Sequence, residues 1–341
     1  MTLLVWLAST AWAQVACGDT LTADTTLTAD LVCAKGFTGD VLTIGADGIV
    51  LDGDGFAIVA PDADAKVFSN GFSNSVIQDL DVSSSSGTGA GIELRNTTGF
   101  QVLNVIASGN ATGILGRSGV KSLTVTDTDV SDSTAWGMDF QQADAGLLIA
   151  RNTFDDSAEG LRIDQMTGPW TLSNTKGNLN TFVAVARGGD AGDVIFLDTV
   201  DDVTIDGQDL SDTLGIGRGV FITNSTDVTV SNNDLSGRRR GLQTGGSANS
   251  GLVITGNDAS DSTDFAMLFQ RISTPFTLES NIFDDSDQGL RIDDLSNWTM
   301  PNNNSFAGVP ANNANDDIIE LQDTTNITFD GIDLSAASGD G

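Results

Sequence analysis

A phrase of thirteen residues occurs twice in this chain and constrains its fold more than any other feature. NTFDDSAEGLRID spans 152–164 and NIFDDSDQGLRID spans 281–293, and the two copies agree at ten positions. Such a repeat means that one structural unit is built more than once, and the length of the unit limits the possible architectures.

Short apolar segments recur at a regular spacing around both copies. They begin at Val76, Phe100, Leu123, Leu147 and Trp170, and again at Val203, Val228, Leu252, Phe276, Trp298 and Ile327. Two steps are longer than the others, from Trp170 to Val203 and from Trp298 to Ile327, and each follows a tryptophan. Five segments therefore form one higher-order repeat, in which Val76 corresponds to Val203 and Trp170 to Trp298.

Each unit has the pattern of two or three short strands joined by polar turns. The first strand alternates apolar residues with Thr, which predicts an apolar inner face and a polar outer face. The outward threonines are Thr124, Thr171, Thr204, Thr229, Thr277, Thr299 and Thr328. The turn that follows is rich in Asn, which tolerates the left-handed backbone of a sharp corner. The corner residues are expected to be Asn152, Asn232, Asn257, Asn281 and Asn302, and stacked Thr and Asn are expected to form outer ladders. A second strand then begins with Gly, at 91, 137, 160, 219, 241 and 289.

The composition disfavours helices between these strands. The chain has 39 Gly, and only four of its 47 acidic residues are Glu. Asp favours turns, whereas Glu favours helices. We therefore predict an all-β solenoid, a single-stranded parallel β-helix of about 22–25 residues per coil in which each coil pairs with the last. A β-propeller is the alternative, but its blades need about 40 residues or more.

The charge excludes some classes of partner. A formal charge of −32 argues against nucleic acid and anionic membrane surfaces, which both need clustered cations. The densest basic run is Arg238, Arg239 and Arg240, which we interpret as a solvated turn. The 15 Lys and Arg are otherwise dispersed along the sequence, which disfavours a polyanionic substrate.

The N-terminus predicts export. Residues 1–16 resemble a signal peptide, because an apolar stretch from Leu3 to Ala13 closes on a small-x-small pattern. The stretch is too short to span a bilayer, so no transmembrane segment is expected. The predicted location is secreted, at the cell surface or in the periplasm. Cys17 and Cys33 are expected to pair there, and a lipid anchor on Cys17 is the alternative.

The segment CGDTLTADTTLTADLVCAKGFTGDVLTIGADGIVLDGDGFAIV, at 17–59, begins the series of coils. It resembles the start of right-handed parallel β-helix proteins, the pectin-lyase-like superfamily that includes NosD-like and parallel β-helix repeat proteins. We expect 17–60 to form an N-terminal cap and first coil with a Cys17–Cys33 disulfide, and 61–341 to form the β-helix. The sequence stops in the middle of a coil, so a C-terminal continuation or a partner that covers the sheet edge is expected. The resemblance implies little about activity, because this fold carries lyases, hydrolases, epimerases and adhesins.

Outward residues of the Gly-led strands predict a polar cluster. Neighbouring coils should place Asp139 beside Arg162 and Gln141 beside Asp164. In β-helix polysaccharide lyases, carboxylates bind Ca²⁺ and a nearby Arg or Lys takes a proton from the uronate. The resemblance therefore makes Asp139, Arg162 and Asp164 candidate catalytic residues, with Ca²⁺ as a possible cofactor. The candidate binding residues are Gln141, Gln270, Arg291 and Asp293.

A purely structural interpretation of this cluster is favoured over catalysis. An Arg and an Asp two residues apart on an exposed strand form ordinary cross-strand ion pairs. A catalytic site is also usually unique, whereas this phrase belongs to a duplicated set of five coils. Asp155, Asp156, Asp284 and Asp285 are expected in turns, with loose Ca²⁺ binding as the minor alternative.

The predicted function is a rigid, acidic scaffold for binding or display, toward extracellular polysaccharide. The alternative is a carbohydrate-active enzyme (a polysaccharide lyase, hydrolase or epimerase), which would need a groove walled by the long connection at about 176–193. A copper-related role like that of NosD proteins is disfavoured, because the chain has no His and its methionines form no cluster. These methionines are Met138, Met166, Met267 and Met300.

Overall fold

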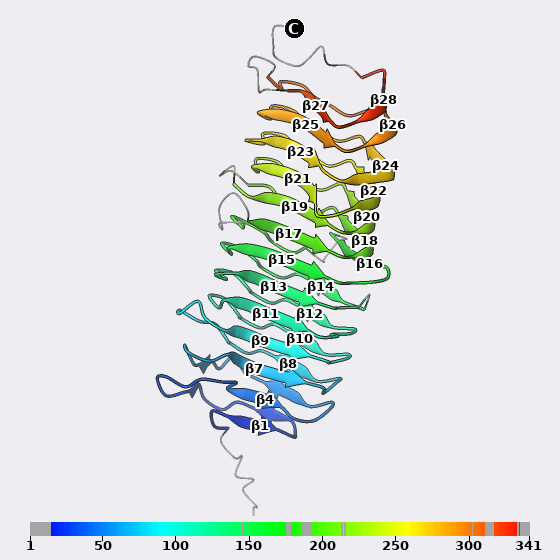
Figure 1. Cartoon of the computed structure of the whole chain (residues 1–341). Coiled ribbons are helices and arrows are strands. Elements are labelled where there is room, and N and C mark those ends of the chain that lie inside the picture. Colours follow the sequence, from blue (N-terminus) through cyan, green and yellow to red (C-terminus); the bar gives the residue numbers. More distant parts are fainter. Residues whose placement is uncertain are drawn as a thin grey trace, which may run out of the picture.

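The computed structural model describes residues 15–332 and 334, apart from 145, 175–178, 186–191, 213, 215, 302 and 311–316. The described residues contain 28 strands and no helix, and they wind into a parallel β-helix of about 12 turns (Figure 1). The predicted fold class is therefore confirmed. In the described part of the chain, no helix could cross a bilayer. Of the signal peptide predicted at 1–16, only residues 15 and 16 belong to this part, and the expected C-terminal continuation after residue 341 lies outside it.

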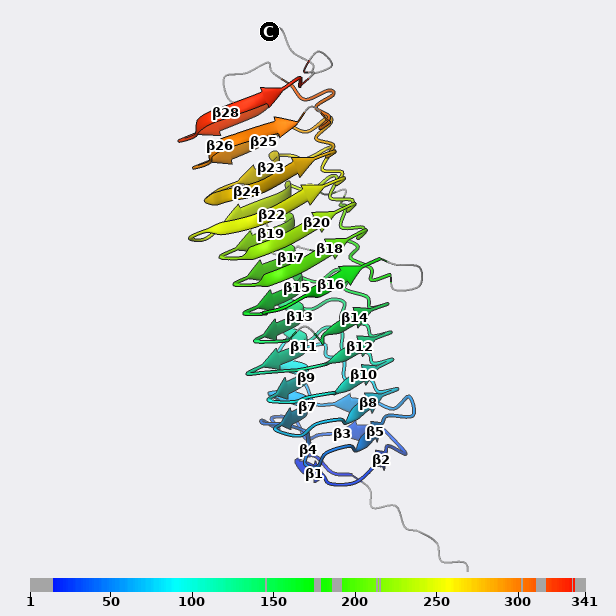
Figure 2. The same ribbon diagram turned by 90° about the vertical axis from the view of Figure 1, so that its right-hand side faces the viewer.

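One side of the solenoid is a 13-stranded parallel sheet, in which each coil adds its strand next to that of the coil before (Figures 1 and 2). In spatial order its strands are β1 (Asp19–Leu21), β4 (Leu42–Ile44), β7 (Ala65–Asn70), β9 (Ala90–Arg95), β11 (Thr112–Arg117), β13 (Trp136–Gln141), β15 (Glu159–Asp164), β17 (Asp193–Asp198), β19 (Arg218–Thr223), β21 (Arg240–Gly245), β23 (Phe265–Phe269), β25 (Gln288–Asp293) and β27 (Ile319–Gln322).

The second side is divided into three sheets. The first contains β2 (Thr25–Thr26), β5 (Val50–Asp52), β8 (Val76–Gln78), β10 (Gln101–Leu103), β12 (Thr124–Thr126) and β14 (Leu148–Ala150). The next contains β16 (Trp170–Ser173), β18 (Asp201–Asp206), β20 (Thr226–Ser231), β22 (Asn249–Thr255) and β24 (Ile272–Glu279), and the last contains β26 (Ser296–Pro301) and β28 (Thr325–Asp330). A further pair is formed by β3 (Leu31–Val32) and β6 (Ile58–Val59).

The segment 17–60 contains the strands of two stacked coils. β1 pairs with β4, β2 with β5 and β3 with β6, all in parallel. Cys17 and Cys33 form a disulfide across the first of these coils, with a Cα–Cα distance of 5.8 Å. The bridge ties the beginning of this coil to its end.

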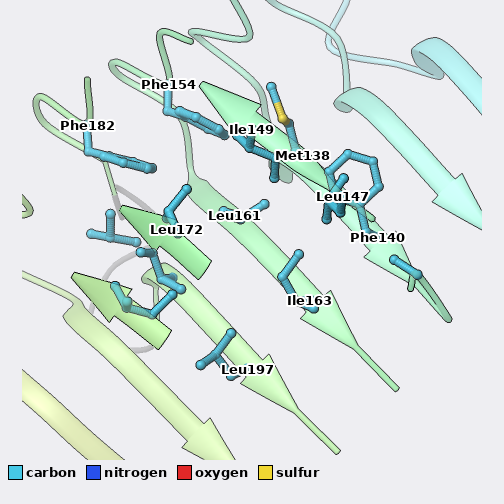
Figure 3. Close-up of a cluster of buried hydrophobic side chains, with 14 of the residues drawn as sticks. Met138, Phe140, Leu147, Ile149, Phe154, Leu161, Ile163, Leu172, Phe182 and Leu197 are labelled. Carbon is cyan, nitrogen blue, oxygen red and sulfur yellow. The ribbon is translucent and has the colours of Figure 1, made fainter. Parts of the chain in front are cut away.

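The interior is a column of stacked apolar side chains. Met138, Leu161 and Ile195 occupy successive steps of one row in the 13-stranded sheet, and all are fully buried. Ile163, Leu172 and Ile292, which the period predicts to point inward, are also buried. Figure 3 shows this packing between the two sides of the solenoid. Burial of such residues in every coil supplies the main driving force for folding.

The two tryptophan coils mark the breaks on the second side. Trp170 Nε1 donates a hydrogen bond to Leu147 O at 2.7 Å, and Trp298 Nε1 donates one to Phe276 O at 2.9 Å. In both places the indole bonds to a carbonyl of the preceding coil, and a new sheet begins at the tryptophan strand. The same arrangement at both sites supports the five-coil repeat.

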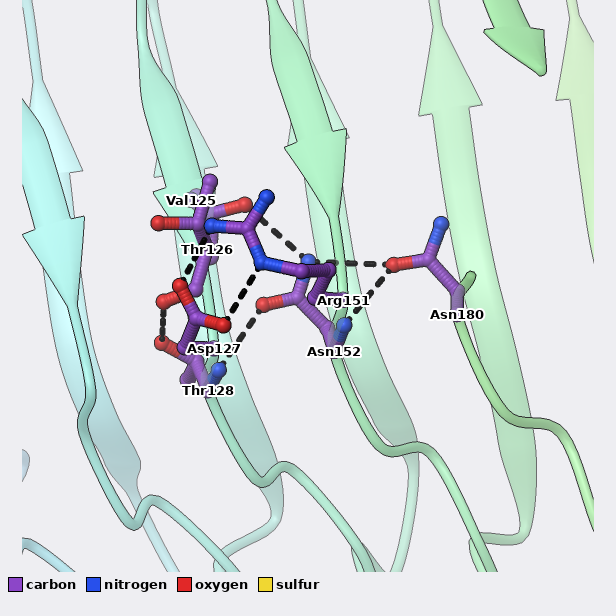
Figure 4. Close-up of polar contacts among 7 residues, drawn as sticks. All are labelled: Val125, Thr126, Asp127, Thr128, Arg151, Asn152 and Asn180. Carbon is purple, nitrogen blue, oxygen red and sulfur yellow. Dashed lines mark hydrogen bonds and ion pairs between the residues drawn. The ribbon is translucent and has the colours of Figure 1, made fainter. Parts of the chain in front are cut away.

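Asparagines form ladders inside the solenoid, so the predicted outer asparagine ladder was wrong. Asn257 is fully buried, its backbone N–H donates to Asn281 Oδ1 at 3.0 Å, and its Nδ2 donates to Val230 O at 2.8 Å. Asn152 and Asn180 repeat this arrangement (Figure 4). The inner amides satisfy backbone groups that the corner removes from the sheets.

The left-handed corner residue precedes the ladder asparagine. Arg151, Gly256 and Ser280 have φ of 58°, 67° and 58°, so the prediction for Asn152, Asn257 and Asn281 was wrong by one residue. Asn232 is left-handed as predicted, with φ of 55°, and Asn302 lies outside the described residues. The predicted outward threonines are partly or fully exposed.

The repeated phrase is mostly scaffold. Its phenylalanines stack on the next coil, Phe154 on Phe182 at 4.6 Å and Phe283 on Phe306 at 4.7 Å between ring centroids. Its serines, Ser157 and Ser286, are fully buried and bond to backbone carbonyls of the preceding coil. The phrase therefore specifies one corner and one strand of a coil in both copies.

Candidate functional site

Three columns of side chains stand on the outer face of the 13-stranded sheet, because each coil contributes one residue to each column. Between β13 and β21 the first column contains Trp136, Glu159, Asp193, Arg218 and Arg240. The second contains Asp139, Arg162, Phe196, Phe221 and Gln243, and the third contains Gln141, Asp164, Asp198, Thr223 and Gly245. We call the first two columns, from Trp136 and Asp139 to Arg218 and Phe221, the outer strip.

The structure brings the three candidate catalytic residues together. Asp139 pairs in register with Arg162, and Gln141 with Asp164. Arg162 Nη2 lies 3.3 Å from Asp164 Oδ2, and Arg162 Nε lies 3.8 Å from Asp139 Oδ1. Gln141 Nε2 donates to Asp139 Oδ2 at 2.9 Å. Asp139 Oδ1 and Arg162 Nε are buried and have no hydrogen-bond partner within the described part of the chain.

The other candidate binding residues form a separate cluster. Gln270 Nε2 donates to Asp293 Oδ2 at 2.9 Å, and Arg291 Nε donates to Asp293 Oδ1 at 2.9 Å. Four strands lie between β15 and β25, so this cluster is about 24 Å from Arg162 at the usual strand spacing. The two clusters therefore cannot act on one sugar residue.

An aromatic spine runs through the outer strip. Trp136 stacks with Phe196 at 6.1 Å between ring centroids, and Phe196 stacks with Phe221 at 5.3 Å. The Arg218 guanidinium lies over the Phe221 ring at 3.8 Å, and that of Arg162 lies 5.6 Å from the Phe196 ring centre. All three rings are half-buried, so the spine presents a narrow apolar surface between charged groups.

Two carboxyl groups beside this spine differ from ordinary surface acids. Burial raises the pKa of Glu159 to about 7, and the neighbouring Asp193 carboxylate is the second largest cause of this shift. Burial also raises the pKa of Asp193 to about 6, against the effect of Arg218, whose Nε and Nη2 donate to it at 2.6 and 3.0 Å. The pKa values of Asp139 and Asp164 are raised as well, chiefly by burial. The strip therefore holds acids that change protonation near neutral pH.

The first column and the coil of β17 are not among the features predicted from the sequence. Glu159 and Trp136 stand before the Gly that begins the predicted strand, so the predicted strands do not include them. β17 lies partly within the stretch that we interpreted as a long connection. The apolar run at 194–197 could have indicated this strand. It is bounded by Asp193 and Asp198 and repeats the pattern of a Gly-led strand without the Gly.

Cations that are dispersed in the sequence gather on this face. Six of the 15 Lys and Arg stand in its columns, namely Arg95, Arg117, Arg162, Arg218, Arg240 and Arg291. The coil period brings them together, so their dispersal along the chain does not disfavour any substrate. Neighbouring carboxylates offset their charge, as in the Arg218–Asp193 and Arg240–Asp264 pairs at 2.6 Å.

The interpretation of the arginine triplet as a solvated turn was wrong. Arg238 is fully buried, and its Nε and Nη1 donate to Leu210 O at 2.6 Å and Val185 O at 2.7 Å. Arg239 and Arg240 both pair with Asp264. Arg238 occupies the corner position that Ser262 has in the next coil, since the backbone carbonyls of both residues accept the equivalent bond. Arg238 therefore stabilises the interior of the solenoid by bonding to the backbone carbonyls of Leu210 and Val185.

The predicted groove wall lies largely outside the described residues. The structure describes only 179–185, 192 and 193 of the connection at 176–193. Residues 179–184 line a hollow of about 490 Å³ together with Asp209, Ser211, Asp212 and Leu214. This lining contains none of the three candidate catalytic residues.

The donor set does not fit a copper site. The chain has no His, and Cys17 and Cys33 are joined in a disulfide. Met138, Met166, Met267 and Met300 are fully buried in the core. Within the described ranges, no group of three or more His, Cys, Asp or Glu is placed to hold a metal ion. The aspartates of the repeated phrase instead bond to the next coil, Asp155 to Val183 N and Asp284 to Ala307 N.

One family model matches part of the chain. Residues 170–309, less than half of the chain, match the family model described as periplasmic copper-binding protein (NosD). No curated protein sequence matches the chain.

Three solved structures are similar to this chain over most of its length. Tailspike protein 3 of bacteriophage CBA120 is 13% identical, with 92% of this chain and 55% of that chain covered and a TM-score of 0.46. The catalytic domain of a GH87 α-1,3-glucanase is 9% identical, with coverage of 94% and 61% and a TM-score of 0.43. The A-module of mannuronan C-5 epimerase AlgE6 from Azotobacter vinelandii is 13% identical, with coverage of 92% and 89% and a TM-score of 0.41. The chain thus spans little more than half the length of the first two structures. This protein is a parallel β-helix, and its residues 170–309 resemble the NosD family.

Proposed function

We propose that this protein is an exported β-helix that binds an extended polysaccharide along the outer strip. The aromatic spine of Trp136, Phe196 and Phe221 is the observation that carries the proposal. Sugar rings have apolar C–H faces and hydroxyl rims, so they match a narrow apolar surface bordered by carboxyl and guanidinium groups.

The length of the strip favours a polymer over a single sugar. From β13 to β19 it crosses four strands, which is about 14 Å at the usual spacing of parallel strands. An extended glycan that lies along the solenoid axis would meet new side chains in every coil. Several weak contacts would therefore add along the chain.

The strip is also rigid before any ligand arrives. Arg218 is held by Asp193 on one side and lies against Phe221, and Asp139 is held by Gln141. Side chains that are fixed in this way lose little conformational entropy on binding. This suits a scaffold that must bind through few contacts per coil.

Export is supported by the cysteines. Cys17 and Cys33 form a disulfide, and such bridges persist in oxidising compartments. The apolar stretch before it remains a signal-peptide prediction. The family model that matches residues 170–309 is also described as periplasmic.

Binding to a panel of neutral and uronate polysaccharides, measured by affinity electrophoresis and calorimetry, tests this proposal. Trp136→Ala should weaken binding at least about tenfold, the usual effect of losing an aromatic anchor. Thr229→Ala, which changes the second side of the solenoid, is the matched control and should bind normally. Failure of the wild-type protein to bind any polymer, or an equal loss in both variants, would overturn the proposal.

Catalysis on the bound glycan is the second candidate function, and Glu159 is the observation that favours it. Among the described residues, no hydrogen bond or ion pair engages its carboxyl group, and its pKa of about 7 lets it hold a proton near neutrality. Glycosidic cleavage commonly needs one protonated and one ionised carboxyl group, and Asp193 supplies a neighbour with a lower pKa. The test is incubation with each polymer, with and without Ca²⁺, followed by assays for reducing ends and unsaturated products. Glu159→Gln should abolish turnover and preserve binding, whereas a fully active Glu159→Gln enzyme would exclude this role.

A further inference from the structure

Lys66 is a lysine in the interior of the solenoid. It lies in β7, at the position that Gly91 and Gly113 occupy in the next two coils, and only 2% of its surface is exposed. Its Nζ donates a hydrogen bond to Asn110 Oδ1 at 2.5 Å. Buried lysines are rare because the ammonium group loses its hydration, so this one calls for an explanation.

Asn110 is fully buried and its amide group has a fixed orientation. Its Nδ2 donates to Val82 O at 2.9 Å and to Ala107 O at 2.8 Å, which leaves Oδ1 to face Lys66. Asn110 occupies the corner position that Ser133 has in the next coil, because both backbone carbonyls accept the equivalent bond from the coil above. A serine hydroxyl is therefore sufficient at this corner position. The amide group of Asn110 is an additional feature of the coil whose corner contacts Lys66.

We propose that Lys66 and Asn110 form an intramolecular isopeptide bond. The neutral Nζ attacks Asn110 Cγ, the Nζ–Cγ bond forms, and the Cγ–Nδ2 bond breaks. A proton passes from Nζ to Nδ2, which leaves as ammonia. The step is a transamidation that needs no oxidant, reductant or other reactant.

The surroundings of the pair favour each part of this step. Burial lowers the pKa of Lys66 to about 8, against the opposite effect of the Asp81 charge, so an appreciable fraction of the amine is neutral. The contact holds nucleophile and amide together in the folded chain, which replaces a bimolecular encounter. The hydrogen bonds from Nδ2 to Val82 O and Ala107 O fix the orientation of the amide group.

The bond would join the coil of β7 to the corner that leads into β11. Lys66 belongs to the coil of β7, and Asn110 lies at the corner before β11, 44 residues further along the chain. A covalent link of this kind constrains the unfolded chain and prevents the coils at this end from separating. It would act beside the Cys17–Cys33 disulfide, which closes only the first coil.

Peptide mapping of the purified full-length protein tests the proposal directly. Without the bond, trypsin should release 36–66, 67–95 and 96–117, because cleavage follows Lys35, Lys66, Arg95 and Arg117. With the bond, cleavage after Lys66 should be blocked, and 36–95 should be recovered joined to 96–117 with a mass lower by one ammonia.

Asn110→Ser is the matched control, because it restores the corner residue of the next coil. It should yield the three separate peptides and the full mass of its sequence. Recovery of free 67–95 from the wild-type protein, with no loss of ammonia, would overturn the proposal whether or not the variant folds. This readout does not depend on polysaccharide binding.

Discussion

The two copies of the repeated phrase share their interior and differ in their outer neighbours. Leu161 and Leu290 are both fully buried, and in each copy the following tryptophan bonds to the preceding coil. On the outer face, Glu159 of the first copy corresponds to Gln288 of the second. Asp139, beside Arg162, corresponds to Leu268, beside Arg291.

Identical outward residues therefore have different surroundings in the two copies. Arg162 lies between Asp139 and Phe196, whereas Arg291 lies between Leu268 and Glu320. The repeat determines where each column of side chains stands, because it fixes the core and the corners. The candidate functional residues are those at which the two copies or their neighbours differ. A comparison of the identical residues alone does not find them.

The interior asparagines should give the largest and most equal effects in the two copies. Asn152→Ala and Asn281→Ala each leave buried backbone groups without partners, so each should lower the free energy of unfolding by about 2–4 kcal/mol. Urea denaturation followed by circular dichroism measures this loss. Thr171→Ala, at an exposed position of β16, is the control and should change it by less than about 0.5 kcal/mol. A large loss in one copy and none in the other would show that the copies are not equivalent scaffolds.

The matched arginines should separate scaffold from binding. Arg162→Met should weaken polysaccharide binding about tenfold, because it removes a cation from the outer strip and the contact with Phe196. Arg291→Met makes the same chemical change outside the strip and should leave the affinity unchanged. Calorimetry with the best polymer from the binding panel measures both. Equal losses of affinity in the two variants would mean that the polysaccharide binds away from the outer strip or along the whole sheet.

The pH dependence of stability should distinguish Glu159 from its counterpart Gln288. The folded-state pKa of Glu159, about 7, is above its ordinary value of 4.5, so the folded protein holds this proton more tightly than the unfolded chain. The associated stability is fully present below pH 4.5 and is lost as the pH rises through 7. Glu159→Gln keeps a neutral group at every pH. It should be more stable than the wild type at pH 8 by about 1 kcal/mol, a modest value because the group is partly exposed, and equal to it at pH 4. Paired urea titrations at the two pH values measure the difference, and a gain of the same size at pH 4 would assign it to packing.

The fold could be predicted from the sequence because its period is a direct consequence of stacking. Each coil must bring its apolar residues to the same column, so segments such as Leu147 and Phe276 recur at nearly constant steps. Alternation then assigns inward and outward residues on each strand, which placed Asp139 beside Arg162 correctly. These features depend only on the strand period and on burial.

The corners and the first outer column could not be predicted in the same way. At a corner the alternation stops, so the sequence did not show that Asn152 points inward or that Arg151 takes the left-handed conformation. Arg238 appeared to be a surface charge because nothing local reveals the backbone carbonyls of Val185 and Leu210 that surround it. Glu159 and Asp193 stand in register on neighbouring strands although the coil that joins β15 to β17 is longer than its neighbours, and the additional length made this coil resemble a connection in the sequence.

The smallest effect is expected from the ion pair next to the asparagine ladder. Arg151 and Asp127 stand at stacked corners, with Arg151 Nε 2.7 Å from Asp127 Oδ1, and both side chains are nearly half exposed (Figure 4). Their counterparts in the second copy are Ser280 and Gly256, which cannot form an ion pair, and that copy has the same corner geometry. Water and salt screen an exposed pair of this kind, so Arg151→Gln should leave the melting temperature unchanged in high salt and nearly unchanged in low salt. Thermal unfolding at both salt concentrations measures this, with the neighbouring Asn152→Ala as the destabilised reference. If Arg151→Gln were as damaging as Asn152→Ala, the inner ladder that maintains the fold and the outer surface that is free to vary would not be separable at this corner, where the two residues are adjacent in sequence.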